Sequence, residues 1–254
     1  KIDKRRHYIL VLDTETANTI INPDGSMDMS SVLVYDCGWQ IIDTHGNVYS
    51  KSSYINRDIF YKEKELMKSA YYANKIPMYE AQITDGSRIV ASTYEIRKAM
   101  CDDIKKWNIK EVCAHNARFD YNALNIIQRY TTKSKYRYWF PYSIEIWDTM
   151  KMAKSVILQM PTYRKFCEKY GFLTKTGKLS CTAENLYRFI IKDPTFVEAH
   201  TGLEDVKIES QILTYCYRQH KKMSKKLFEK VLTNDHHMLI LFISNIYSRT
   251  GANI

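Results

Sequence analysis

Residues 9–16 read ILVLDTET. This stretch begins with four large apolar residues, two of them β-branched, which is typical of a strand buried on both faces. It ends at two acids, Asp13 and Glu15, with one residue between them. Because side chains alternate along a strand, both carboxylates are expected to point to the same face where the strand ends.

The apolar periodicity of the rest of the chain predicts an α/β fold. Strands are expected first, at 7–14, 32–43 and 47–55, the last two joined by a tight turn at THGN. Further on, helices are expected at 62–74, 93–107, 118–130, 161–171, 182–192 and 201–219, short strands at 111–117 and 144–149, and irregular chain at 75–91. Three strands followed by this alternation imply a mixed β-sheet flanked by helices.

Nothing in the composition divides the 254 residues into separate globular parts. Hydrophobic residues make up 45% of the chain, and only 8 Gly and 5 Pro occur, which argues against disorder. We expect one domain over residues 1–220 and a helical C-terminal extension, residues 221–254, packed on the same domain.

The charge balance points to a polyanionic partner. Lys and Arg exceed Asp and Glu by 38 to 28, which favours nucleic acid or an anionic membrane surface. The apolar run MLILFISNI at 238–246 is too short to cross a bilayer, so no membrane association is expected. The six cysteines form no CxxC pair, as in the reduced thiols of an intracellular protein, and a cytoplasmic location is expected.

Asp13 and Glu15 are the first candidates for a metal site. Two close carboxylates repel each other unless a cation lies between them, and hard oxygen ligands suit Mg²⁺ or Mn²⁺. A solvated strand end or a turn would explain the same residues. Asp120, in the first turn of a predicted helix, is a third candidate, although the helix dipole alone favours an acid there.

The segment EAHTGLEDV, residues 198–206, contains two more candidates. His200 stands at the start of a predicted helix, and Asp205 follows with apolar neighbours, Val206 among them. A charge beside a buried stripe needs a partner or a metal. A capping histidine and an ordinary surface aspartate are the alternative.

Taken together, three motifs resemble those of one enzyme family. DTET ends the first strand, HNARFD (115–120) lies at a strand-to-helix junction, and H-x4-D opens a late helix. In this order they resemble the DEDDh (DnaQ-like) 3′–5′ exonucleases of the ribonuclease H-like superfamily, over about residues 7–220. The sister group has Tyr four residues before the last Asp, where this chain has Thr201, so the resemblance is to the histidine subgroup.

The resemblance implies a chemistry and assigns residues to it. The family hydrolyses phosphodiester bonds from the 3′ end of single-stranded DNA or RNA with two divalent ions, Mg²⁺ or Mn²⁺. Its four metal-binding carboxylates fall on Asp13, Glu15, Asp120 and Asp205. Its general base falls on His200.

The sequence also departs from the family's usual motifs. It reads DTETANT where many members read DxETTG, and Gly202 replaces a frequent Ala. The segment between residues 56 and 91 is long for the smallest members. These departures bear on substrate preference more than on the chemistry.

Substrate-binding candidates come from the motifs and from one basic stretch. The resemblance places Thr14, Thr16, Asn116 and Phe119 near the terminal nucleotide, although Phe119 fits core packing equally well, and it leaves His115 a structural role. Residues 121–144 contain no acid, and Lys133, Lys135 and Arg137 alternate there with aromatic residues. Positive charge beside aromatic faces suits single-stranded nucleic acid; an exposed loop with its aromatics turned inward is the alternative.

Two other readings of the whole chain stay open from the sequence. One is a DnaQ-like module that binds nucleic acid or a protein partner without catalysis. The other is a nuclease on the same scaffold that cuts internally, which the H-x4-D spacing disfavours. The sequence does not separate DNA from RNA as substrate, and it leaves open whether the chain forms a homodimer.

Overall fold

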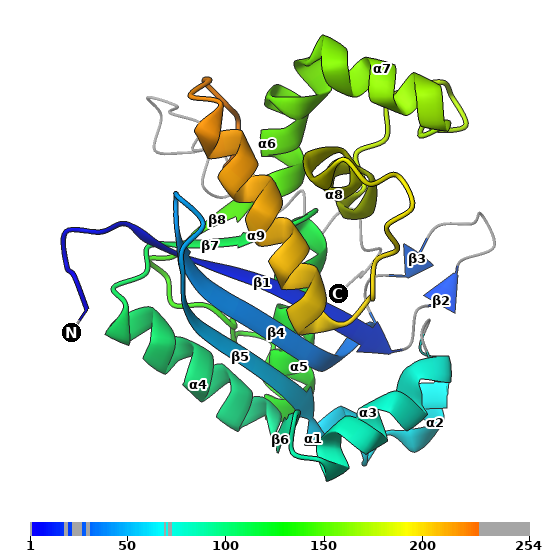
Figure 1. The fold of residues 1–254 in the computed structure, drawn as a ribbon. Coiled ribbons are helices and arrows are strands. Elements are labelled where there is room, and N and C mark those ends of the chain that lie inside the picture. Colours follow the sequence, from blue (N-terminus) through cyan, green and yellow to red (C-terminus); the bar gives the residue numbers. More distant parts are fainter. Residues whose placement is uncertain are drawn as a thin grey trace, which may run out of the picture.

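The computed structural model describes residues 2–17, 20–21, 27–28, 31–68, 70 and 73–228. Six strands form one sheet in the order β6-β5-β4-β1-β7-β8 (Figure 1). Their bounds are β1 Tyr8–Ala17, β4 Leu33–Asp43, β5 Val48–Asn56, β6 Ile89–Ala91, β7 Glu111–Ala114 and β8 Glu145–Asp148. A separate pair consists of β2 Ile20–Ile21 and β3 Met27–Asp28.

The sheet is mixed, as predicted. β4 is antiparallel to both β1 and β5, whereas β7, β8 and β6 each join a neighbour in parallel. β1 lies inside the sheet between β4 and β7, and Ile9, Leu10 and Val11 are completely buried. The predicted α/β fold, a mixed sheet flanked by helices, is therefore confirmed.

Helices cover both faces of the sheet, and successive side chains of β1 point alternately into the two helical layers. Leu10 and Leu12 pack with α4 (Thr93–Lys106) and α5 (Arg118–Thr132). Ile9 and Val11 face the opposite side. That side is covered by α6 Thr149–Ser155, α7 Pro161–Tyr170, α8 Ala183–Ile191 and α9 Gly202–Arg218, with a 3-10 turn at Ile157–Gln159. In Figure 1, α9 crosses this face over β1 and β4.

The segment between β5 and α4 differs from the sequence prediction. It contains α1 Arg57–Phe60, α2 Lys64–Lys68, a 3-10 turn at Ala73–Lys75, and α3 Ile76–Thr84 before β6. The helix expected at 62–74 is thus much shorter, and the irregular chain expected at 75–91 was wrong. Pro77 lies in the first turn of α3, where a proline starts a helix rather than breaking it.

The chain after α9 lines the edge of the sheet as far as it is described. The N–H groups of Asp148 and Leu227 bond to carbonyls of Lys225 and Ile146, and Trp147 pairs with Lys226 in antiparallel fashion. Residues 229–254 lie outside the described residues, so the division at residue 220 stays a prediction. Within the described part, no helix combines the length and the apolar character needed to cross a membrane.

Candidate active site

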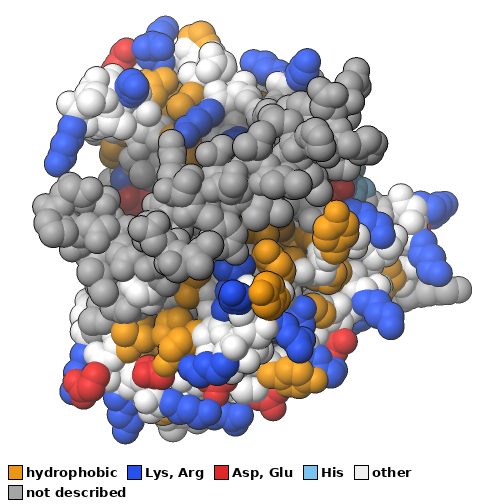
Figure 2. All heavy atoms as spheres, turned by 180° about the vertical axis from the view of Figure 1, so that it is seen from behind, with side chains coloured by type: hydrophobic (Ala, Val, Ile, Leu, Met, Phe, Trp, Pro, Cys, Tyr) orange, Lys and Arg blue, Asp and Glu red, His pale blue; other side chains and the backbone are white. Residues whose placement is uncertain are grey.

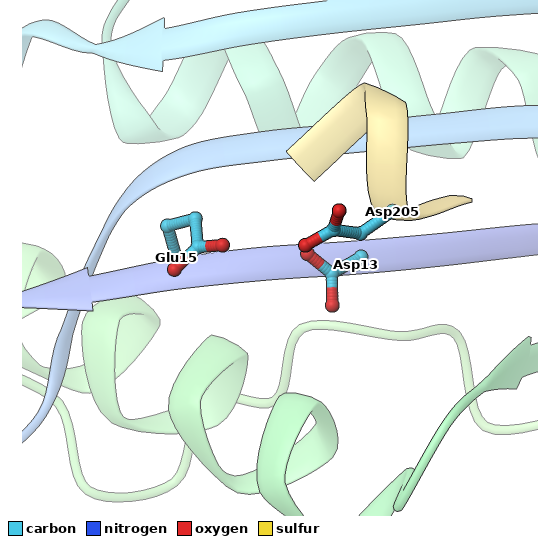
Figure 3. A group of neighbouring side chains, drawn as sticks. All are labelled: Asp13, Glu15 and Asp205. Carbon is cyan, nitrogen blue, oxygen red and sulfur yellow. The ribbon is translucent and has the colours of Figure 1, made fainter. Parts of the chain in front are cut away.

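Three of the predicted acids meet at the end of β1. Asp13 and Glu15 project from the same face of the strand, and Asp205 comes from the first turn of α9 (Figure 3). One carboxylate oxygen from each lies within 4.8 Å of the others. A β-bulge between Glu15 and Thr16 interrupts the pairing with β4 at this point, as bulges beside functional sites commonly do.

Two glycines let α9 approach closely enough to bring Asp205 there. A Cβ on Gly38 of β4 would lie 2.5 Å from the Leu203 nitrogen, and a Cβ on Gly202 would lie 2.9 Å from the Gly38 nitrogen. Both neighbours are backbone atoms, so neither can rotate aside. The replacement of the family's frequent Ala by Gly202 therefore has a structural reason: helix and strand touch backbone to backbone.

A buried ionic network fixes the start of α9 against β4. Asp36 accepts a hydrogen bond of 3.1 Å from the Gly202 N–H and pairs with Arg88 at 3.2 Å. Arg88 also pairs with Glu204 at 3.0 Å, and the Thr201 hydroxyl donates to the same Glu204 carboxylate. Motif reasoning missed Asp36 and Arg88, because a single acid in a strand and a single base in a loop carry no spacing signal.

Asp120 reaches the end of β1 from the opposite helical layer. Its Oδ1 accepts hydrogen bonds from the Thr14 N–H at 3.1 Å and the Thr14 hydroxyl at 2.8 Å. Asp120 is not part of the group of oxygens within 4.8 Å, although its charge acts on both Asp13 and Glu15. Thr14 thus holds Asp120 beside the cluster rather than within it.

Burial and mutual repulsion of the clustered acids favour the binding of a cation between them. Burial raises the pKa of Glu15 to about 9, of Asp205 to about 8 and of Asp120 to about 7, with neighbouring acids adding to the rise. Burial, followed by the charges of nearby acids, also raises the pKa of Asp13. Among the described residues, Asp13 Oδ2 and Asp205 Oδ1 are buried without a hydrogen-bond partner. Oxygen ligands with free lone pairs and mutual repulsion fit Mg²⁺ or Mn²⁺.

His200 lies beside Asp205 on the chain that leads into α9. Its Nδ1 is 3.7 Å from Glu198 and 4.0 Å from Asp205, and about a third of its side chain (37%) is exposed. The residue has a φ of 51°, a left-handed conformation that is uncommon outside glycine. Partial burial and the Lys75 ammonium lower the pKa of His200, which favours the neutral imidazole.

Lys75 is a contact that the sequence did not predict. Its ammonium donates to the carbonyls of Ala199 and His200, the second at 3.0 Å, and its charge acts on Glu15 and Asp205. The residue comes from the segment expected to be irregular, where a lone lysine gave no signal. It holds the backbone of His200 and places a positive charge next to the acids.

The remaining motif residues differ in burial. Thr14 and Thr16 are buried, Asn116 is exposed with a φ of 59°, and Phe119 is half-buried. Both ring nitrogens of His115 have hydrogen-bond partners at 2.8 Å, the Thr149 hydroxyl and the Cys181 carbonyl, in keeping with a structural role.

The basic stretch, residues 121–144, begins within α5, and the part that follows this helix, residues 133–138, is largely exposed. Lys133 and Lys135 lie over the rings of Tyr130 and Tyr136, with 4.4 and 5.3 Å between ammonium and ring centroid. A hollow of about 440 Å³ next to the stretch is lined by aromatic and aliphatic side chains, among them Tyr138 and Tyr142. Figure 2 shows one face of the molecule on which Lys and Arg side chains lie beside exposed hydrophobic ones. For Tyr136 and Tyr138 the inward-turned alternative was wrong, since these residues are 56% exposed or more, whereas Trp139 is turned inward with 2% exposed.

Comparison with known proteins finds similarity in structure alone. No protein-family model and no curated protein sequence matches the chain. A structure of cell-death related nuclease 4 (CRN-4) is similar at a TM-score of 0.48 and 12% identity, over 87% of this chain and 67% of that one. S. pombe Pop2p, in a Mg²⁺- and Mn²⁺-bound form, gives 0.47 and 10%, over 84% and 83%.

A zinc-bound E. coli ExoI–ssDNA complex gives a TM-score of 0.45 and 12% identity, over 85% of this chain and 41% of that one. Scores and identities this low transfer no activity, substrate or metal to this chain.

Gly38→Ala is expected to displace the start of α9, because the added Cβ would meet backbone atoms of Gly202 and Leu203. Overpacking of this kind costs about 1–3 kcal/mol of unfolding free energy. Moving Asp205 away from Asp13 should also weaken cation binding. Urea unfolding measures the first effect, and calorimetric titration with Mn²⁺ measures the second.

Gly171→Ala is the matched control. Gly171 ends α7 with a φ of 77°, and a Cβ there meets nothing within 4 Å. This variant should lose about 1–2 kcal/mol through backbone strain and keep its affinity for Mn²⁺. Unchanged Mn²⁺ affinity in Gly38→Ala would contradict the role given to the glycine contact.

Proposed function

We propose that this chain is a divalent-cation-dependent 3′–5′ exonuclease that hydrolyses phosphodiester bonds of single-stranded DNA or RNA. The observation that supports it best is the meeting of Asp13, Glu15 and Asp205, from segments almost two hundred residues apart. Asp13 Oδ2 and Asp205 Oδ1 are buried there without a hydrogen-bond partner among the described residues. All five groups of the DEDDh motif set are present, which argues against a module that only binds.

The cation would be held by Asp13, Glu15 and Asp205, with Asp120 adding charge from the other side of β1. Two divalent ions, Mg²⁺ or Mn²⁺, are proposed; when bound, such ions polarise phosphoryl oxygens and make water a stronger nucleophile at neutral pH. Without them, the acids would repel a substrate phosphate, so the cation-free protein is expected to be inactive.

His200 is proposed to accept the proton of the attacking water. Only a neutral imidazole can do so, and burial together with Lys75 lowers the pKa of His200 in the direction that keeps it neutral. Lys75 also bonds the carbonyls of Ala199 and His200, which supports the imidazole's position beside Asp205. Glu198, 3.7 Å from Nδ1, is placed to stabilise the imidazolium that forms.

Thr14, Thr16, Asn116 and Phe119 are proposed to border the terminal nucleotide. They surround the acids in sequence, and Thr14 touches Asp120 directly. The basic aromatic segment, residues 129–142, is proposed to carry the strand that leads away from the site. Its exposed rings suit base stacking, and its cations suit phosphates.

The direct test is degradation of end-labelled single-stranded DNA and RNA, compared side by side with Mg²⁺, Mn²⁺ or chelator. Fragments should shorten from the 3′ end, a 3′ block should stop the reaction, and a 5′ block should not. Chelator should abolish activity, because the acids then lack their cation. Rapid cutting of circular single-stranded DNA would instead identify an endonuclease, and inactivity on every substrate would favour the binding module.

His200→Ala should lower single-turnover cleavage by about 10²- to 10⁴-fold, the usual contribution of a general base. Binding of Mn²⁺ and of substrate should persist, because His200 is not assigned as a ligand. Asp13→Asn is the comparison, since removing a charge from the centre of the cluster should weaken cation binding itself. If His200→Ala cleaves at the wild-type rate, or loses Mn²⁺ as Asp13→Asn does, the assignment is wrong.

Replacing Lys133, Lys135 and Arg137 together by Ala should weaken binding of single strands. Each lost phosphate contact should reduce the log–log salt slope by up to about 0.7. Arg164, Lys165 and Lys169 on α7 are the control, because they are exposed and their replacement removes the same charge. A salt slope that changes equally in both triple variants, or in neither, would make the segment ordinary surface.

A further inference from the structure

A fifth acid lies at the cation site, outside the motif set. Glu209 follows Asp205 by one helical turn on α9, so both side chains project from the same face of the helix. Only 3% of Glu209 is exposed. No motif pointed to this residue, because an acid four residues after another on a helix usually lies on a solvated face.

The carboxyl group of Glu209 lies inside the protein, within electrostatic reach of the clustered acids. Its Oε2 is buried with no hydrogen-bond partner among the described residues. Burial raises the pKa of Glu209 well above its usual range, while a hydrogen bond from the backbone N–H of His115 acts in the opposite direction. The charges acting on it most strongly belong to Asp120, Asp205 and Glu198. In return, Glu209 is the charge that acts most strongly on Asp13, ahead of the three motif acids. The thiol of Cys113, on β7, also senses its charge.

Such a residue is costly if its role is only structural. Without a cation, Glu209 must either bury an unpartnered charge, which costs several kcal/mol, or take up a proton, and an uncharged side chain of similar shape would avoid both. Arg88 and Lys75 pair elsewhere, and no ion pair to Glu209 occurs within the described ranges. A cation beside Asp13 would offset the buried charge.

We infer that Glu209 is a fifth carboxylate of the cation site, a positioning residue on α9 that strengthens cation binding through Asp13 and Asp205. Its oxygens do not join those of Asp13, Glu15 and Asp205 within 4.8 Å, so it acts behind the residues that would touch the ion. The inference deepens the proposed function, because it rests on the same cation site. It does not require that the protein cleave nucleic acid.

The test is Glu209→Gln, which keeps the shape and removes the charge. Loss of a group that supports metal ligands typically weakens metal affinity by about 10- to 100-fold, and that fall is expected for Mn²⁺ measured by calorimetry or electron paramagnetic resonance. In chelator, the variant should melt at or above the wild-type temperature, because a buried unpaired carboxylate has been removed. A residue with only a structural role is not expected to lower Mn²⁺ affinity when it is replaced while leaving the melting temperature in chelator unchanged or higher.

Two control variants test whether the effect is specific to the charge of Glu209. Ser210→Ala changes the next buried residue of α9, whose hydroxyl also lacks a partner among the described residues, and Glu168→Gln removes an exposed charge from α7. Both should bind Mn²⁺ with wild-type affinity. Glu209→Asp keeps the charge and should recover part of the affinity that Glu209→Gln loses.

Two results would overturn the inference. One is wild-type Mn²⁺ affinity in Glu209→Gln; the other is a lower melting temperature in chelator for both Glu209→Gln and Glu209→Asp. Because Mn²⁺ binding is measured without nucleic acid, its outcome is independent of the cleavage assays. If Mn²⁺ affinity depends on Glu209 but the protein degrades no strand, the nuclease proposal is refuted and the inference about Glu209 stands.

Discussion

The backbone contact between Gly38 and Gly202 is the constraint on which the site depends. Asp13 and Glu15 are local to β1, but the third acid belongs to a helix that begins almost two hundred residues later. That helix delivers Asp205 because neither glycine has a Cβ to separate strand from helix. The Asp36–Arg88–Glu204 network then holds the start of α9 in place, so packing and ionic bonding act on the same few residues.

The cost of this arrangement is a concentration of negative charge in a poorly solvated place. Burial raises the pKa values of the four motif acids and Glu209, and the charges of neighbouring acids add to the rise. Several of their oxygens find no partner among the described residues. The protein thus has the electrostatic conditions of a cation site built into its core. Lys75 offsets part of the negative charge and donates a hydrogen bond to the backbone carbonyl of His200.

The long segment between β5 and α4 connects the fold to the site. This segment is longer than its counterpart in the smallest DEDDh proteins. It supplies Arg88, which anchors α9, and Lys75. Its helices are short, and their packing against the core through Ile59, Met67 and Tyr79 is what determines them. Isolated helices of this length are marginal in water, so local sequence carries little signal for them.

The sequence by itself determined the mixed α/β fold, the buried first strand and three of the clustered acids, Asp13, Glu15 and Asp205. Those features depend on local periodicity and on the spacing of residues within motifs, both of which are readable along the chain. Only the tertiary structure decided the roles of Gly38, Lys75, Arg88 and Glu209. Each acts through neighbours that are distant in sequence, and close approach, burial and charge coupling exist only once the strand and the helix have packed together.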